Sequence, residues 1–199
     1  MSVNLLTPDE VARALAVRDL SDPSQGPHAV QRVVDDVVAA LVRDWRCDVK
    51  VHRGERIVTL HDNYDGLGYS ADAITRDARY TRYVSETHVL RSHTSALVPG
   101  ALRALEPDRD DVLLVCPGVV YRRDSIDRLH TGVPHQLDLW RVTRDRVLTA
   151  VDLKDMVEVV VRAALPGAHY RVERRIHPYT TEGMQIDVVN GDEWVEIGE

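Results

Sequence analysis

Two strand-like runs that flank a short charged segment constrain the fold of this chain more than any other feature. Residues 111–122 and 134–142 are apolar with alternating side chains, which is typical of strands. The segment between them reverses the chain, so the pair predicts a β-hairpin. The middle of this hairpin carries arginine, aspartate and histidine with little apolar sequence between them. A loop that only reverses the chain does not need such a cluster.

The remaining elements predict an α+β fold with a mainly antiparallel sheet flanked by helices. Thr7, followed by Pro-Asp-Glu, predicts a helix start with a capping box. Residues 30–41 form an apolar stripe at helical spacing. Asp152 is expected to cap a helix that runs to about Leu165. Further strands are expected at residues 48–52, 56–60, 89–93, 169–176, 184–189 and 193–197.

The connections are also predicted. A turn is expected at Gly54, and a tight turn at Asn190-Gly191 joins the last two strands. Residues 62–82 have no clean period and predict an irregular excursion. The stretch after residue 93, through about residue 105, is expected to be helical.

The composition is that of a folded globular protein. The chain has 199 residues, of which 44% are apolar and 29% charged, and its net charge is −7. This negative net charge argues against a domain that binds nucleic acid over its whole surface, although it is compatible with a local basic patch. We expect a short N-terminal helix and linker over residues 1–25 and a core over 26–199. The two cysteines have no CxxC spacing and the N-terminus has no secretory pattern, so we expect a cytoplasmic protein.

The charged hairpin has two interpretations. Arginine pairs bidentately with phosphate oxygens, so Arg122 is a candidate phosphate ligand. Asp124, two residues on, shares a strand face with it and can orient it or accept from an amine. The alternative is a solvated loop whose local ion pairs contribute well under ~1 kcal/mol each.

A second polar cluster favours a binding site. The run LRSHTSA (90–96) places His93 and Ser95 at the end of a strand, while Gln136 and Asp138 alternate on one face of another strand. Gln136 can donate, Asp138 can hold an ammonium, and His93 with Ser95 can hold a carboxylate. These side chains are the donors and acceptors that a site needs to bind both the ammonium and the carboxylate of an amino acid.

In order, the segments LRSHTSA, GVVYRRDSIDRLHTGVPHQLDLW, HPYTTEGMQIDVV and EWVEIGE resemble the catalytic core of class II aminoacyl-tRNA synthetases. The similarity is to the α chain of phenylalanyl-tRNA synthetase and covers roughly residues 20–199. Residues 26–41 lie where that family's motif 1 helix is found, and VYRRD…H…HQLD matches its motif 2.

The resemblance implies that ATP and Mg²⁺ bind around the hairpin. Arg122 would be the catalytic residue, holding the α-phosphate and stabilising the charge that develops there. Asp124 would contact the adenine amine and His130 the outer phosphates. Glu196 would help place ATP and its magnesium. Gln136 and Asp138 would receive the ammonium of the amino acid, which His93 and Ser95 would position.

Two departures from the family concern its ligands. Pro134 stands where the family has the phenylalanine that stacks on adenine. His177 and Tyr179, on either side of Pro178, replace two phenylalanines of the side-chain pocket. A phenylalanine substrate would pack on two apolar rings, whereas an imidazole and a phenol make this amino-acid-binding pocket more polar. The substrate is therefore left open.

The resemblance implies ATP-dependent activation of an amino acid to an aminoacyl-adenylate, with tRNA or another molecule as acceptor. No Gly-rich motif 3 with its arginine is present before Glu199, and no separate tRNA-binding domain is visible. We therefore keep three alternatives: a sequence truncated before motif 3, one half of a split enzyme, and a non-catalytic paralogue that binds an amino acid, a nucleotide or a partner chain. Because the motif 1 helix helps to build a dimer in the family, a homodimer or a completing partner chain is expected.

Overall fold

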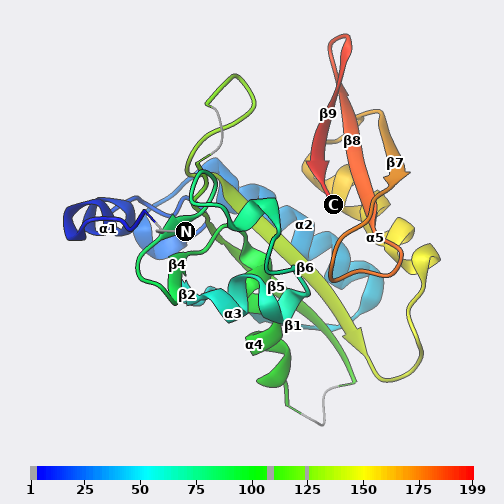
Figure 1. The fold of residues 1–199 in the computed structure, drawn as a ribbon. Coiled ribbons are helices and arrows are strands. Elements are labelled where there is room, and N and C mark those ends of the chain that lie inside the picture. Colours follow the sequence, from blue (N-terminus) through cyan, green and yellow to red (C-terminus); the bar gives the residue numbers. More distant parts are fainter. Residues whose placement is uncertain (1–3, 107–109, 124–125) are drawn as a thin grey trace.

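A computed structural model describes residues 4–106, 110–123 and 126–199 of the chain. Within these ranges the strands form three three-stranded sheets, and helices pack on them (Figure 1). One pair of neighbouring strands is parallel and the other pairs are antiparallel. The predicted α+β class with mainly antiparallel pairing is thus confirmed, although the strands are divided among three sheets.

The central sheet contains the predicted hairpin. Strand β5 (Asp111–Val119) pairs antiparallel with β6 (His135–Thr143) over its whole length, and β1 (Asp48–Val51) lies parallel to the other edge of β5. Apart from half-buried Asp111, every residue of β5 is buried. Alternate β5 side chains enter two different apolar clusters, so both faces of the strand are covered.

Two long helices cover one face of this sheet. Helix α2 (Ala29–Trp45) and helix α5 (Ala150–Ala164) pack together and against Leu113 and Val115 of β5. The N-cap of α5 is Thr149, and Asp152 is the third helical residue, whose carboxylate accepts from the Thr149 backbone N–H at 2.7 Å. The prediction that Asp152 is the cap was therefore wrong by three residues, because both residues belong to one capping box.

The opposite face is covered by a small second sheet. It has the order β2 (Ile57–Thr59), β4 (His88–Leu90), β3 (Arg82–Tyr83). Strands β1 and β2 flank the turn at Gly54, which has a positive φ of 53°, but they enter different sheets. The irregular excursion forms the short helix α3 (Leu60–Asn63) and two single 3₁₀ turns, at Asp65–Leu67 and Ile74–Arg76.

The strand expected at residues 89–93 ends at Leu90. A 3₁₀ turn, Thr94–Leu97, follows and leads into helix α4 (Val98–Arg103). Residues Arg91 to His93 consequently form an irregular connection between a strand and a 3₁₀ turn, with bends at Ser92 and His93. Polar side chains on such a connection are fixed by their own hydrogen bonds rather than by a sheet.

The third sheet stands on α5 (Figure 1). Strands β7 (Tyr170–Arg174), β8 (Met184–Asn190) and β9 (Glu193–Gly198) are antiparallel neighbours. Their apolar face packs on the helix through Val172, Ile186 and Val188. The turn between β8 and β9 is centred on Gly191 and Asp192, one residue later than predicted, because Asn190 still pairs with Glu193.

The N-terminal segment lies against the hairpin. Helix α1 (Pro8–Leu15) begins with the predicted capping box at Thr7, and the 3₁₀ turn Pro23–Gln25 follows it. The Tyr121 hydroxyl donates to the Ala14 carbonyl at 2.9 Å, and the Leu20 N–H donates to Nε2 of His135 at 2.9 Å. Among the described residues, no helix is both long and apolar enough to span a membrane.

Candidate functional site

Arg122 leaves the end of β5 and lies against the connection that follows β4. Its Nε donates to the carbonyl of Ser92 at 3.0 Å, and its own carbonyl accepts from the Arg82 guanidinium at 2.9 Å. The Arg122 N–H donates to the Gly132 carbonyl at 3.0 Å. Both its backbone and its guanidinium are therefore held, with the side chain directed along the residues next to His93.

The imidazole of His93 is fixed as one tautomer. Its Nε2 lies 2.9 Å from the carbonyl oxygen of Asn63, and because a carbonyl only accepts, Nε2 carries the proton. Burial, followed by the nearby charge of Arg122, lowers the pKa of His93 to about 4. The ring is neutral at neutral pH, and Nδ1 is its hydrogen-bond acceptor.

Asn63 ties this connection to helix α3. The residue is fully buried, and its amide makes two hydrogen bonds to Ser92. Nδ2 donates to the Ser92 hydroxyl at 2.8 Å, and Oδ1 accepts from the Ser92 N–H at 3.1 Å. The same Ser92 accepts from Arg122 through its carbonyl. The Asn63 side chain thereby holds the backbone at Ser92, the residue that binds Arg122 and precedes His93.

Asp138, in the middle of β6, is surrounded by donors. Its carboxylate accepts from the Thr94 hydroxyl at 2.6 Å, from the Ser95 hydroxyl at 3.1 and 3.2 Å, and from the Trp140 indole at 3.4 Å. Burial raises the pKa of Asp138, and these hydrogen bonds oppose the shift. Gln136 lies two residues away, and its Oε1 accepts from the Thr94 N–H at 3.2 Å.

Four of the predicted amino-acid ligands thus meet where the connection after β4 reaches β6: His93, Ser95, Gln136 and Asp138. The expectation that His93 and Ser95 together hold a carboxylate does not match their contacts. His93 is neutral and bound to a carbonyl, while Ser95 donates to Asp138. The charge of Arg122 also acts on His93, so a cation lies close to this imidazole.

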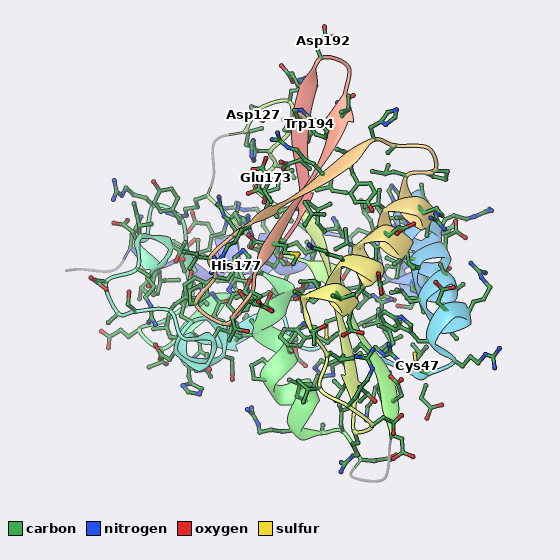
Figure 2. The ribbon with its side chains drawn as sticks, turned by 90° about the vertical axis from the view of Figure 1, so that its right-hand side faces the viewer. Cys47, Asp127, Glu173, His177, Asp192 and Trp194 are labelled. Atoms are coloured by element: carbon green, nitrogen blue, oxygen red, sulfur yellow. The ribbon has the colours of Figure 1, made fainter. Side chains whose placement is uncertain are left out.

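A row of rings extends from His93 to the segment between β7 and β8. The ring centroids of Tyr69 lie 5.9 Å from His93 and 6.1 Å from Tyr179, and Tyr179 stacks on His177 at 5.8 Å. Nε2 of His177 lies 2.9 Å from the Glu199 carboxylate. Figure 2 shows His177 at the lower end of the third sheet, far from the turn at Asp192. The predicted pocket residues His177 and Tyr179 therefore adjoin His93 through Tyr69.

The predicted ATP ligands are not gathered in the same way. His130 lies in the exposed loop and pairs with Asp127 at 2.8 Å. Asp124 falls outside the described residues. Glu196 is exposed on β9, directly opposite the buried Asp187 of β8. The loop is joined to the β8–β9 hairpin by an ion pair between Arg128 and Glu193 at 2.5 Å.

Three residues of the site were missed in the sequence. Asn63 and Tyr69 lie in the excursion that predicted no regular structure, and Glu199 follows the last strand. A buried asparagine next to a short helix leaves no periodic signal. Within the site, Tyr69 contacts His93 and Tyr179, and Glu199 contacts His177, and only the tertiary structure reveals these contacts between separate segments.

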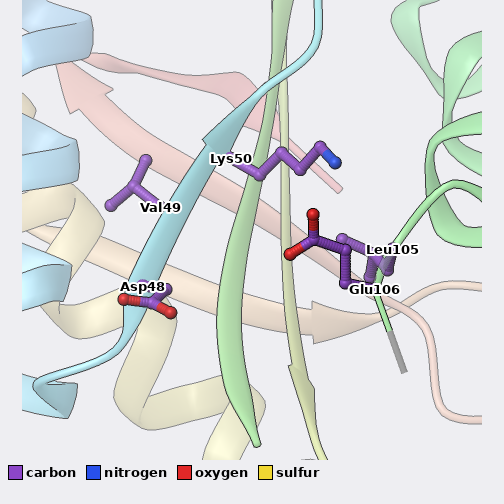
Figure 3. Close-up of a pocket in the computed structure, with 5 residues that line it drawn as sticks. All are labelled: Asp48, Val49, Lys50, Leu105 and Glu106. Atoms are coloured by element: carbon purple, nitrogen blue, oxygen red, sulfur yellow. The ribbon is translucent and has the colours of Figure 1, made fainter. Parts of the chain in front are cut away.

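A separate pocket of about 190 Å³ lies at the outer edge of β1, against the end of α4. Figure 3 shows Lys50 and Glu106 on either side of it, and Asp48, Val49 and Leu105 complete its lining. Lys50 donates to the Ala104 carbonyl at 3.4 Å. Within the described ranges, no three histidine, cysteine or acidic side chains come together as a metal site. The arrangement around Asp138 is thus the better candidate site.

Known proteins are similar to this chain in sequence or in fold. The chain is similar to the phenylalanine–tRNA ligase alpha subunits of Nostoc punctiforme, at 31% identity over 74% of the chain and 43% of the relative, and of Synechocystis sp., at 29% over 88% and 51%. It therefore spans about half the length of these curated relatives. A solved pyrrolysyl-tRNA synthetase from Desulfitobacterium hafniense superposes with a TM-score of 0.54 at 16% identity, over 83% of this chain and 54% of that one. The family model of the tRNA synthetase class II core domain (F) matches residues 16–199, so the chain belongs to the class II tRNA synthetase core family.

Proposed function

We propose that this chain activates an amino acid with ATP, forming an aminoacyl-adenylate and releasing pyrophosphate. The observation that carries the proposal is that one short segment holds both an arginine and a carboxylate: the Ser92 carbonyl accepts from Arg122, and Thr94 and Ser95 donate to Asp138. Asp138 is fixed by Thr94 and Ser95, and one residue before Thr94 lies His93, whose pKa Arg122 helps to lower. A negative and a positive anchor at one place suit the two charged groups of an amino acid.

In the proposed reaction, a carboxylate oxygen of the amino acid attacks the α-phosphorus of ATP, and the bond from that phosphorus to the bridging oxygen of pyrophosphate breaks. Arg122 would bind both the carboxylate and the α-phosphate and stabilise the charge of the transition state. Asp138 and the side-chain oxygen of Gln136 would receive the ammonium. His93, with Nδ1 as acceptor, would contact the same group. Such catalysis rests on positioning and charge stabilisation, and no protein nucleophile takes part.

ATP would lie between Arg122 and the third sheet. The resemblance assigns Asp124 to the adenine amine and His130 to the outer phosphates. Magnesium is usually bound by one or two carboxylates together with substrate phosphates. Glu196, exposed on β9, would supply such a carboxylate, whereas Asp187 opposite it on β8 is buried and already accepts from Arg171 and Gln185. Magnesium, when bound, would neutralise part of the phosphate charge.

The acceptor and the partners also belong to this proposal. The relatives are named alpha subunits of a tRNA ligase, which supports tRNA as acceptor and a second chain as partner. The edge strand β1 is exposed along its length, including Val49 and Val51. The backbone groups of an edge strand can pair with a strand of another chain. We therefore propose that a second copy or a completing chain binds at this edge.

Amino-acid-dependent exchange of ³²P between pyrophosphate and ATP tests the proposal. The wild-type chain should support exchange with a narrow set of amino acids. Arg122→Ala should lower the exchange rate by about 10²–10³-fold, because it removes a stabilising charge from the transition state. Arg79→Ala, which removes an exposed arginine paired with Asp77, is the matched control and should leave the rate unchanged. Full activity of Arg122→Ala would refute the assignment of this arginine.

A further inference from the structure

The far end of the site, beyond Asp138, contains a second carboxylate. Glu199 lies 2.9 Å from Nε2 of His177, which is buried and whose Nδ1 lies 3.1 Å from the Thr180 hydroxyl. A histidine balances a carboxylate only when it is protonated. The Glu199 side chain is partly exposed, so it is accessible to a ligand as well as to the imidazole.

Two carboxylates, Glu199 and Asp138, lie close enough to Tyr179 to act on its phenol. Burial is the main reason that the pKa of the Tyr179 phenol is raised, and the charges of Glu199 and Asp138 raise it further. The charge of Glu199 also raises the pKa of Asp138 and the pKa of Tyr69, in both cases after the larger effect of burial. The phenol of Tyr179 therefore lies within the field of both carboxylates.

The same end presents aromatic faces. Tyr69 and Tyr179 are tilted by 44° with their centroids 6.1 Å apart, and His177 stacks on Tyr179 with its centroid at 5.8 Å. Aromatic faces attract a cation that lies within about 6 Å of the ring centre, and they do so most strongly where water is excluded. Carboxylates beside aromatic rings suit an amine better than they suit an apolar ring.

From this arrangement we infer that the site selects an amino acid whose side chain ends in an amine, such as L-lysine or L-ornithine. This inference rests on the proposed amino-acid activation. The α-ammonium would bind Asp138, the α-carboxylate would bind Arg122, and the second amine would bind Glu199 against the rings of Tyr69 and Tyr179. A phenylalanine side chain would instead cover the Glu199 carboxylate without pairing with it, which is unfavourable.

The experiment compares L-lysine with L-norleucine, which has nearly the same chain without the amine, and with L-phenylalanine. Pyrophosphate exchange gives kcat/KM for each with the wild-type chain. We expect lysine or ornithine to exceed norleucine and phenylalanine by at least about tenfold, the size of one charge-assisted hydrogen bond. Glu199→Gln should remove most of this preference. Glu158→Gln, which alters an exposed helix pair with Arg162, should keep it.

The outcomes separate the two proposals. A preference for phenylalanine or norleucine, unchanged in Glu199→Gln, would overturn the inference and leave amino-acid activation intact. Absence of exchange with every amino acid would contradict activation by this chain. Calorimetric titration with lysine and norleucine would then still test the inferred preference for an amine side chain. Tighter binding of lysine than of norleucine, lost in Glu199→Gln, would support this preference. Equal binding of the two would overturn it.

Discussion

The hydroxyl of Thr94 donates a 2.6 Å hydrogen bond to the carboxylate of Asp138, across 44 residues of sequence. This bond joins the turn after β4 to the middle of β6, where the hairpin strand passes the site. Ser95 donates to the same carboxylate, so two consecutive residues hold it from one side. The acid is therefore held in one position in the free protein.

Replacing Asp138 by asparagine should separate its binding role from its structural one. The amide keeps an oxygen for Thr94 and loses the charge whose burial raises the pKa of the acid. We expect the KM for the amino acid to rise by about 10–100-fold, because a hydrogen bond to a charged group is lost. The melting temperature should change little. Asp155→Asn, on the exposed side of α5, is the control for the charge change.

His93 should make the stability of the protein depend on pH. An unfolded chain binds a proton at this histidine below about pH 6.5, whereas the folded protein binds it only near pH 4. Between these values the unfolded state holds more protons, so stability should fall as the pH decreases, by up to about 3 kcal/mol. Urea titrations between pH 4 and 7.5 measure this slope.

The matched variant is His93→Gln, whose amide can still donate to the Asn63 carbonyl. It should flatten the pH dependence without removing it, because burial also lowers the pKa of His135. An identical slope in the variant and the wild type would show that His93 titrates normally in the folded protein.

The sequence predicted the elements with strong local signals. The capping box at Thr7 and the apolar stripe of α2 are short-range patterns, and both were confirmed. The cap of α5 was misplaced because Thr149 and Asp152 both carry capping oxygens and only the backbone geometry distinguishes them. The division into three sheets has no local signal, since it depends on which edges meet after the chain folds.

The candidate site was predictable to a similar extent. Alternation placed Gln136 and Asp138 on one face, and the polar run after Leu90 marked its second half. The contact between these halves, and the direction of each hydrogen bond, required the tertiary structure. The aromatic row from Tyr69 to His177 joins segments more than a hundred residues apart, so no sequence window contains it.

Asn63 should be a positioning residue, with Ser92 as its partner. Asn63→Ala removes both bonds of the amide and leaves the Ser92 N–H without its acceptor, which costs about 1–3 kcal/mol. Because the Ser92 carbonyl also binds Arg122, kcat for exchange should fall more than the loss of stability alone explains. Ser92→Ala removes the hydroxyl, which contacts Asn63 and Tyr64, but keeps the backbone bond to Asn63, so it should have the smaller effect on both. Equal effects on kcat in the two variants would contradict a role in placing the backbone.

Gly118 should tolerate no side chain. A methyl group there would lie 2.1 Å from Nη2 of Arg91, a guanidinium that is 1% exposed and donates to the carbonyls of Val119 and Arg53. Gly118→Ala must displace this buried cation, and we expect a loss of about 3 kcal/mol or more in unfolding free energy. Gly100→Ala is the control, because its nearest neighbour is a flexible side chain at 4.0 Å within helix α4. Alanine there should raise stability by about 0.5–1 kcal/mol. Comparable melting temperatures for the two variants would show that Arg91 moves aside and that position 118 does not require glycine.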